Sequence, residues 1–431
     1  MMGKIMQSSL LPEMIIQAQP DGWEVLRQQA EQALIGQVWP DIFQKSWGSV
    51  ELDLIKNMMP KVWSGTTTIS TDQIPTPETM RSSMVFINGH FDISRSNTSD
   101  LPTGVQMLDL ASNRSMVSEL GSLVGLMDAN LLVNINTARF MDGLLLIVPE
   151  GVQVESPLRV SFINGQTDNK QVAISLPRLL IVLKSGSSVT LLEDYQGYGR
   201  YLTSSVTEVI VGSNARLNHE RVQRESHEAL HFSQLAISVG RDGHYNGRTV
   251  SLGGLSSWLV QNLTMVEQGA DVTLDGLTII SDNQKSSTQS TIDHSSSDCT
   301  SKQAHRIIAD KASLATFDGI ICVHKDTKGT NAQQQCRGML LAAEAQISLK
   351  PQLKIYADDV KCGHGAAVGQ LDPEMLFYLQ SRGVHPALAR NMLTYAFASY
   401  LLANVSIPSL KKRLYKLIMA ITNAEYLETF K

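Results

Sequence analysis

A three-residue pattern that recurs through the second half of the chain limits the fold more than any other feature of the sequence. In each copy a small residue is followed by any residue and then by an apolar one, and successive copies are 28, 28, 27, 42 and 33 residues apart. Such near-constant spacing is typical of a stacked solenoid. The small residues are Ser187, Ala215, Gly243, Ala270, Ala312 and Ala345, and the apolar residues are Val189, Leu217, Tyr245, Val272, Leu314 and Ile347.

The interval between copies indicates which kind of solenoid the chain forms. It leaves no space for the amphipathic helices of about 10 to 15 residues that a βαβ fold places between its strands. We therefore expect a parallel β-helix from about residue 145 to residue 370, with surface loops in the two longer intervals. The apolar member of each copy is expected to point inward at the same place on every turn. A β-sandwich with a coincidental period is the alternative.

Helical segments are expected on both sides of the repeats. Residues 1–62 show helical periodicity, and one segment there begins after a capping Asp21 and is closed by Gly36. A linker rich in Ser, Thr and Pro follows at 64–83. The sequence thus predicts three parts, namely an N-terminal helical region with linker at 1–83, a β-helix core at 84–370 and a C-terminal helical domain at 371–431.

The C-terminal part carries distinct helix signals. Asp372 precedes Pro373, which is the pattern of an N-cap followed by proline in the first turn, and Gly383 is expected to end this helix. Pro386 opens a second helix, and Ser409 is expected to cap a third. These helices are apolar over more than one face. That pattern predicts either packing among the helices or one stripe that docks on a partner.

Charge and composition exclude several classes of function. The net charge is −5 and no stretch approaches the ~20 apolar residues of a membrane span, so neither nucleic acid nor a membrane is an expected partner. The first residues lack a secretory signal, and we expect a cytoplasmic protein. The cysteines form no C-x-x-C pair and are expected to be reduced thiols rather than a disulfide framework or a zinc ribbon. They are Cys299, Cys322, Cys336 and Cys362.

Three sequence features bear on catalysis. "HEALH" (227–231) would be a zinc protease site on a helix, but it lies between repeat anchors and precedes a strand-like alternation, so we expect solvated strand histidines. No phosphate-binding loop is present, and we do not expect the chain to hydrolyse ATP by itself. Asp271, Asp275 and Asp318 lie near repeat turns. They leave a carbohydrate-active β-helix enzyme as the alternative from another class, although turn aspartates are usually structural.

The stretch "YADDVKCGHG" contains half of a metal site. On a strand, Cys362 and His364 would face the same way with their Cα atoms about 6.6 Å apart. Lys361 and an open strand edge would favour the thiolate, and Asp358 or Asp359 would orient the imidazole. Two donors are too few for zinc or an iron–sulfur cluster, which take about four. The remaining donors must come from elsewhere.

The residues alone leave a structural alternative open at this stretch. A packed cysteine beside a hydrogen-bonded histidine would give the same sequence pattern. "CVH" (322–324) repeats the spacing in the middle of an apolar strand with no carboxylates before it. For that copy we expect Cys322 to be a core residue.

Longer segments resemble a known family. The run "LKPQLKIYADDVKCGHGAAVGQLDPEMLFYLQSRGV" (349–384) closely resembles the C-terminal signature of the SufD branch of the SufB/SufD family, which belongs to the Suf iron–sulfur cluster assembly machinery. The resemblance covers about residues 85 to 400. It also includes "FINGHF" (86–91), "DGLLLIVPEGVQVESPLRV" (142–160), "PRLLIVLKSGSSVTLLEDY" (177–195) and "KDTKGTNAQQQ" (325–335).

The resemblance implies a fold, a function and partners. The fold is a right-handed parallel β-helix core between helical domains, and the function is that of a non-catalytic scaffold. The partners are a SufB-like paralogue and a SufC-like ABC-type ATPase. A transient iron–sulfur cluster or iron is shared with the partner subunit through Cys362 and His364, and no tightly bound cofactor is expected. The ATPase is expected to bind the C-terminal helices, at residues that include Phe377, Tyr378, Arg382, Leu393 and Phe397.

The chain departs from the family pattern in two places. "QQCRGMLL" (334–341) has Cys336 where Asn-containing sequence is expected, and the first 80 residues match only around "KSWGSVEL". A SufB-like scaffold is the alternative within the family, but SufB usually has a glutamate and a histidine in a different local sequence. The resemblance leaves open whether an isolated homodimer forms, whether flavin or iron binds, and which apoproteins are served.

Overall fold

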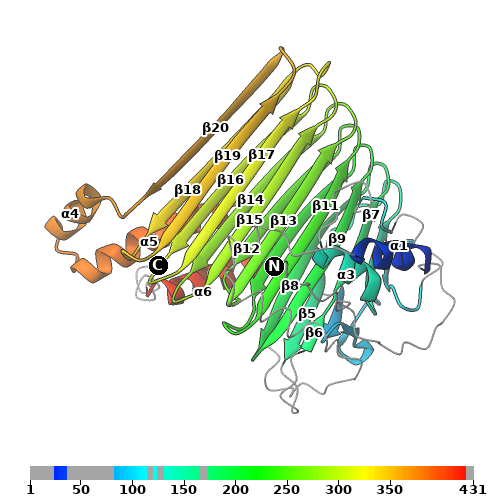
Figure 1. Cartoon of the computed structure of the whole chain (residues 1–431), viewed down its shortest axis with the longest axis horizontal. Coiled ribbons are helices and arrows are strands. Elements are labelled where there is room, and N and C mark those ends of the chain that lie inside the picture. Colours follow the sequence, from blue (N-terminus) through cyan, green and yellow to red (C-terminus); the bar gives the residue numbers. More distant parts are fainter. Residues whose placement is uncertain (1–23, 36–81, 114–119, 124–130, 166–172, 424–431) are drawn as a thin grey trace, which may run out of the picture.

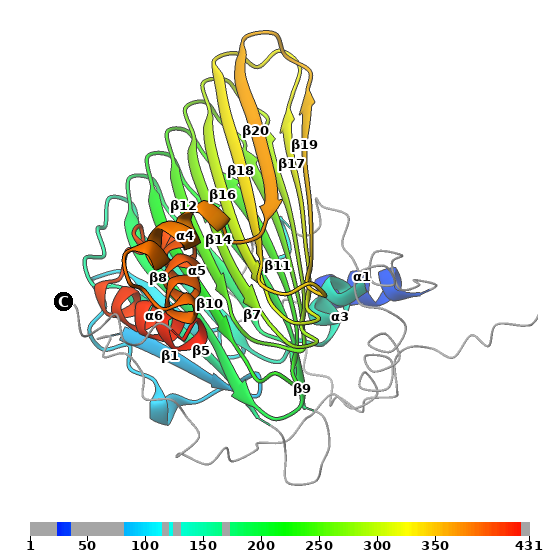
Figure 2. The same cartoon turned by 90° about the vertical axis from the view of Figure 1, so that its left-hand side faces the viewer.

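The protein is built around a parallel β-solenoid, as the sequence predicts. The computed structural model describes residues 24–35, 82–113, 120–123, 131–165 and 173–423. Most of them belong to two ten-stranded sheets, called sheet A and sheet B here, that run along the molecule side by side (Figures 1 and 2). From β8 onward the chain alternates between the sheets, and from β9 onward each strand pairs in parallel with the strand two positions before it.

The strands of the two sheets have the following bounds. Sheet A contains, in spatial order, β2 (His90–Phe91), β1 (Ser82–Ile87), β5 (Leu158–Gly165), β8 (Ser188–Tyr198), β10 (Arg216–Arg224), β12 (His244–Ser251), β14 (Asp271–Ile280), β16 (Thr300–Ala309), β18 (Thr330–Leu340) and β20 (Val360–Gly369). Sheet B contains β19 (Gln346–Ile355), β17 (Leu314–Val323), β15 (Lys285–His294), β13 (Ser256–Met265), β11 (Leu230–Val239), β9 (Tyr201–Val211), β7 (Arg178–Leu183), β4 (Gly143–Val148) and β3 (Gln106–Asp109), with β6 (Ala173–Ser175) also paired to β9.

The first four repeat anchors lie where the spacing places them. They are neighbours in sheet A and all are buried in the interior of the solenoid. Beyond Val272 the prediction is wrong, because Leu314 and Ile347 lie in sheet B, and the 42-residue interval marks a change of sheet rather than a surface loop. The true row, which we call the valine row, is Val189, Leu217, Tyr245, Val272, Ser301, Ala332 and Cys362.

A second row points into the solenoid two residues further along each strand of sheet A. It begins with leucines and ends with polar residues. We call it the leucine row, and it consists of Leu158, Leu191, His219, Gly247, Leu274, Gln303, Gln334 and His364.

Asparagine and aspartate residues make many of the tight turns between the sheets. Their φ angles lie between 50° and 69°, in the left-handed region that these two residue types tolerate better than other non-glycine residues. The period seen in the sequence therefore reflects turn chemistry as well as apolar anchors. The turn residues are Asn214, Asp242, Asp282, Asp298 and Asp326.

The early turns also enclose a charged cluster around Glu193. Its carboxylate lies 3.0 Å from His219 Nε2 and 2.7 Å from Arg221 Nε, and it accepts a hydrogen bond of 2.9 Å from the Tyr195 hydroxyl. Burial alone would raise the pKa of Glu193, but the neighbouring charges of Arg221 and His219 outweigh it and lower the pKa. The cluster is therefore a paired, internally satisfied part of the core.

Three helices follow the solenoid: α4 (Pro373–Ser381), α5 (Pro386–Leu402) and α6 (Pro408–Ile421). Asp372 caps α4 by accepting a hydrogen bond from the Glu374 amide, as the sequence predicts. The predicted cap at Ser409 is wrong, because α6 begins at Pro408 with Ile407 in the N-cap position. Proline at the first helical position supplies the start without a side-chain cap.

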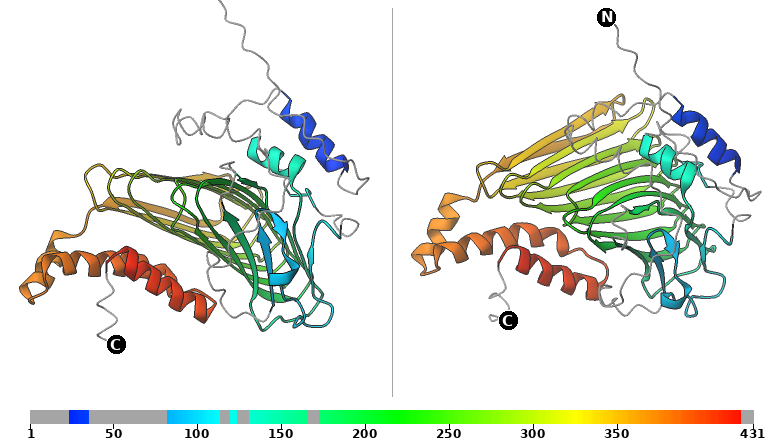
Figure 3. Two further views of the ribbon diagram at one scale, coloured as in Figure 1. Left: turned by 90° about the horizontal axis from the view of Figure 1, so that it is seen from below. Right: turned by 60° about the horizontal axis from the view of Figure 1, so that its bottom comes forward.

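The apolar stripes of α5 and α6 pack on the outer face of sheet A (Figure 3). The loop between them is also tied down, since Glu220 accepts hydrogen bonds from the Ser406 amide at 2.8 Å and from Arg248 at 2.7 Å. By contrast, α4 contributes no buried residue and projects from the end of β20 (Figure 1). The residues in contact are Leu192, Val222, Val250, Leu277 and Ile308 of the sheet with Leu401, Leu402, Leu410, Leu414 and Ile418 of the helices.

The N-terminal helices lie on the other side of the solenoid. α1 (Glu24–Leu34) and α3 (Leu131–Arg139) share an apolar cluster with sheet B, opposite α5 and α6 (Figure 3). The predicted cap Asp21 and the second predicted N-terminal helix lie outside the described residues, and the division of the chain at 83 and 370 stays a prediction. Within the described ranges, no helix has the length and apolarity needed to cross a membrane.

Candidate functional site

Cys362 and His364 lie on the last strand of sheet A. Their in-register neighbours on β18 are Ala332 and Gln334, and among the described strands nothing pairs with the other edge of β20. β19 is likewise the terminal strand of sheet B. The solenoid therefore ends in two adjacent strand edges, and the two candidate donors belong to the last turn (Figure 2).

The two side chains differ in how far they are covered. Cys362 is half-buried and packs against the apolar interior of the solenoid, whereas His364 is exposed. Burial raises the pKa of the Cys362 thiol, and a hydrogen bond with the Ala332 backbone opposes this rise. The expected help from Lys361 in forming a thiolate is therefore wrong for the chain alone, because the thiol faces inward while Lys361 points to solvent.

The predicted orienting carboxylates precede the strand that carries His364. Asp358 and Asp359 are exposed in the turn between β19 and β20. Within the part of the chain that the structure describes, neither carboxylate accepts a hydrogen bond from His364. The register of β20 places His364 beside Gln334.

A shallow groove of about 500 Å³ borders this strand and includes His364 and Gly365. A Cβ added at Gly365 would meet no atom within 4 Å, so the fold of this chain does not itself require glycine there. The absence of a side chain leaves the face of β20 open to close approach by another chain at this position. The other lining residues are mostly polar: Asp275, Lys302, Gln303, Ala304, Gln333, Gln334, Gln335 and Gly363.

The residues expected to bind an ATPase divide into two groups. Phe377 and Tyr378 on α4 are 73% and 54% exposed, and the Arg382 guanidinium lies 5.3 Å from the Tyr378 ring centre. On α5, Leu393 and Phe397 are half-buried. The Phe397 ring and carbonyl contact Arg306 of sheet A, which holds this part of α5 against the solenoid.

The structure corrects the prediction for the second C-x-H pair, at residues 322–324. Cys322 does not lie in the core but faces outward from sheet B and is half-buried. Its cross-strand neighbour is Asp293, and the Asp293 carboxylate lies 2.7 Å from His324 Nε2. Sequence reasoning missed this group because Asp293 is on a different strand. Cys299 and Cys336 are buried.

The remaining sequence candidates do not form a shared site. "HEALH" lies in a turn and the start of β11 rather than on a helix, so it has no zinc protease geometry. The expectation of solvated histidines holds for His227 but is wrong for His231, which is buried and paired with Glu225 at 2.7 Å. Asp275 and Asp318 lie on different sheets, and thus do not form one acidic groove.

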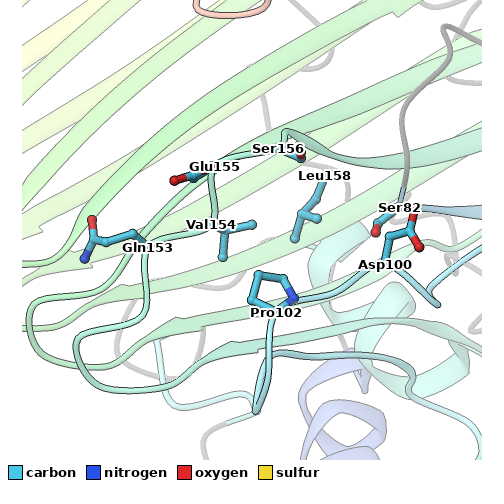
Figure 4. A pocket seen from close by; sticks show the side chains of 8 residues that line it. All are labelled: Ser82, Asp100, Pro102, Gln153, Val154, Glu155, Ser156 and Leu158. Atoms are coloured by element: carbon cyan, nitrogen blue, oxygen red, sulfur yellow. The ribbon is translucent and has the colours of Figure 1, made fainter.

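A second hollow lies near the other end of the solenoid (Figure 4). It has a volume of about 210 Å³ and contains neither cysteine nor histidine. It offers carboxylates and hydroxyls, which are poor ligands for soft metals. Its lining residues are Ser82, Asp100, Pro102, Gln153, Val154, Glu155, Ser156 and Leu158.

Comparison with known proteins identifies the family to which this chain is similar. The family model described as "SUF system FeS cluster assembly, SufBD core domain" matches residues 163–397, and the "SufBD protein N-terminal region" matches residues 73–160. An iron–sulfur cluster assembly SufBD family protein of Synechocystis is 33% identical over 80% of this chain and 79% of its own. The chloroplastic protein ABCI7 of Arabidopsis thaliana is 30% identical, over 87% of this chain and 81% of its own. The iron–sulfur cluster assembly protein SufD of Escherichia coli is 31% identical, over 59% and 61%. The chain belongs to the SufBD family of iron–sulfur cluster assembly proteins.

Proposed function

We propose that the chain is a non-catalytic scaffold subunit of a Suf complex, which pairs with a SufB-like subunit and binds a SufC-like ABC-type ATPase. A nascent iron–sulfur cluster, or iron, is its cargo and is held transiently between the two scaffold subunits. The observation that carries the proposal is the open last turn of the solenoid, where Cys362 and His364 lie beside the edges of β19 and β20.

The number of donors argues for a partner. Zinc and iron–sulfur clusters take about four protein or water ligands, and this turn offers one thiol and one imidazole. Strand edges bind other strands through backbone hydrogen bonds, so a second solenoid added to β20 would bring further donors to the same place. The empty space at Gly365 supports such close approach.

The decisive experiment replaces His364. We expect His364→Ala to lower the iron and sulfide content of the anaerobically reconstituted complex by about 10-fold or more, because a lost ligand costs at least as much as a lost orienting partner. His227→Ala removes another exposed histidine, in a turn of the solenoid, and is the matched control. The same variants are compared for cluster-enzyme activity in cells that lack other assembly systems.

Two outcomes would contradict the role of Cys362 and His364 as cluster ligands. If His364→Ala and Cys362→Ser complexes assemble normally and still carry the full iron and sulfide content, the last turn does not hold the cluster. A complex that fails to assemble in either variant while the isolated chain stays folded would assign these residues to subunit pairing instead of ligation.

The ATPase part of the proposal rests on α4. Phe377 and Tyr378 are large apolar side chains left exposed on a helix that buries none of its residues in the solenoid. Exposed aromatic residues of this kind are typical anchors of protein interfaces. Leu393 and Phe397 would contribute less, because both already pack within the chain.

A charge at Phe377 tests this docking face. We expect Phe377→Glu to weaken binding of the SufC-like ATPase by about 30-fold or more, as for a truncated interface anchor. Ile93→Glu is the control, since Ile93 is 79% exposed on the short helix η3 (Ile93–Arg95), in a part of the sequence remote from α4. Equal affinity for the two variants would move the docking face elsewhere.

The SufD-like role, rather than a SufB-like one, is part of the proposal and is supported by the relatives named SufD in Escherichia coli and Bacillus subtilis. A cytoplasmic location is also part of the proposal. It needs its own test, because one of the relatives is chloroplastic by name. Fractionation of cells carrying the tagged chain distinguishes the compartments.

A further inference from the structure

A group of three different metal-binding side chains lies on the outer face of sheet B, away from the last-turn donors. Their candidate ligand atoms, a carboxylate oxygen, a thiol sulfur and an imidazole nitrogen, all lie within 4.8 Å of one another. We propose that Asp293, Cys322 and His324 form a binding site for one divalent transition-metal ion of the Zn²⁺ class. This inference does not rest on the proposed cluster function.

The solenoid places the three residues by register. Asp293 on β15 and Cys322 on β17 are cross-strand neighbours, so their Cα atoms lie about 4.8 Å apart. His324 follows Cys322 by two residues, just after β17 ends, and its backbone amide donates to the His294 carbonyl at 3.1 Å. Two long, paired strands therefore hold the three side chains together on one face.

The site is accessible from solvent. The side chains of His324 and Asp293 are 50% and 28% exposed, and Cys322 is half-buried. Metal binding here needs no opening of the core. Cys299 and Cys336, which are buried, lack this access.

The donor set favours Zn²⁺ over harder ions. Thiolate and imidazole are ligands for borderline and soft metals, whereas Ca²⁺ and Mg²⁺ require oxygen donors. Tetrahedral zinc at its usual bond lengths places ligand atoms about 3.3–3.8 Å apart, which small side-chain rotations from the present spacing would achieve. Three protein ligands leave a fourth position for water.

The local hydrogen bonds suit a site of this kind. Asp293 Oδ1 lies 2.7 Å from His324 Nε2 and accepts a hydrogen bond of 3.3 Å from the Ser295 hydroxyl, so the carboxylate and the ring already lie close together. Burial and the charge of Asp293 raise the pKa of the Cys322 thiol, while Lys354 lowers it. A bound cation would offset the first two effects by stabilising the thiolate.

The simpler explanation is an Asp–His ion pair with a bystander thiol, and a cobalt titration separates the two. The probe is Co²⁺ added anaerobically to the reduced full chain carrying Cys362→Ser and His364→Ala, so that the last-turn donors cannot contribute. We expect one Co²⁺ per chain with a thiolate-to-cobalt charge-transfer band, and displacement of the Co²⁺ by Zn²⁺.

Three further substitutions in that background assign the ligands. Cys322→Ser should abolish the charge-transfer band, and His324→Ala should weaken binding by about 10-fold or more. Cys336→Ser, at a buried thiol, should leave both unchanged, and circular dichroism reports whether each variant folds. The proposal is overturned if the parent binds no Co²⁺, if the band survives Cys322→Ser in a folded chain, or if Cys336→Ser removes it instead.

Discussion

The first and last turns of the solenoid use the same backbone positions for different purposes. In the early turns the leucine row holds Leu158 and Leu191, which are 1% and 0% exposed. In the last turn the same row holds the exposed His364, and the valine row ends in the half-buried Cys362. Because register fixes where each row points, the chain can exchange core side chains for a thiol and an imidazole at its end without altering the backbone.

Hydrogen bonds link several of the polar side chains that line the last turns. Gln334 Nε2 donates to Gln303 Oε1 at 2.7 Å, and Gln303 Nε2 donates to the Ser290 hydroxyl at 2.8 Å. These side chains are buried, so each would be costly without a partner. The interior thus becomes polar over the last turns, whereas the early turns bury more apolar side chains.

The largest effect is expected at the charged cluster of the early turns. Glu193→Ala leaves Arg221 buried without its main partner, and we expect a loss of about 3–5 kcal/mol in the free energy of unfolding. Urea unfolding followed by circular dichroism measures it. Asp318→Ala, at a half-buried carboxylate that accepts a hydrogen bond from Gln352, is the control and should change stability by less than about 1 kcal/mol. If Glu193→Ala lowers the free energy of unfolding by less than about 1 kcal/mol, the charged cluster is dispensable for stability.

The leucine row offers a direct test of the contrast between early and last turns. Leu274 is 1% exposed, and its replacement by alanine should cost about 2–5 kcal/mol through lost burial and a residual cavity. His364→Ala, in the same row, should change stability by no more than about 0.5 kcal/mol because the side chain is exposed. Hydrogen exchange resolves the two regions separately. Similar losses at both positions would mean that the last turn is as much a part of the core as the middle.

The sequence predicts the part of the fold in which apolar residues recur at a regular interval. Val189, Leu217, Tyr245 and Val272 give a regular spacing, and Asp372 with Pro373 gives a helix start, so both are readable without coordinates. The spacing is lost at Ser301 because the row turns polar there. Beyond that point the same motif of small and apolar residues matches the starts of strands in sheet B instead. In the sequence, this change of sheet looks like a longer loop.

The candidate site is predictable only where its residues are close in sequence. Cys362 and His364 are two apart on one strand, and their placement together follows from strand geometry. Cys322 follows two isoleucines, and a continuous apolar run does not reveal which residues face outward. Its neighbour Asp293 is brought to it by solenoid register, which depends on the length of every turn between them.

A smaller effect is expected at Asp275, a carboxylate on the outer face of sheet A beside Arg248. Burial raises its pKa from 3.8 to about 6, Glu220 adds to the rise, and Arg248 opposes it. The folded chain therefore holds this proton more tightly than the unfolded chain. Stability from this group is present below about pH 4 and is lost as the pH rises to about 6, by on the order of 1–3 kcal/mol.

Asp275→Asn removes this titration. The stability of the variant relative to the wild type should rise between pH 4 and pH 7 by on the order of 1–3 kcal/mol, measured by urea unfolding at each pH. Asp318→Asn, on the other sheet, is the matched carboxylate control. A pH-independent difference for Asp275→Asn would mean that the carboxylate stays ionised in the folded chain throughout this range.

The smallest change in stability is expected at the end of the solenoid, where the functional change should be large. A Cβ at Gly365 meets no atom within 4 Å, so Gly365→Val should alter the free energy of unfolding by no more than about 0.5 kcal/mol. At Gly276, inside the solenoid, a Cβ would lie 2.1 Å from His305 Cε1, and Gly276→Ala should cost about 1–3 kcal/mol. If a partner that adds to the edge of β20 also packs over the face of this strand, Gly365→Val should nevertheless weaken pairing with a SufB-like subunit in size-exclusion chromatography. Unchanged pairing would show that no partner atom packs over this position, because a strand side chain stands off the face of the sheet rather than along its edge.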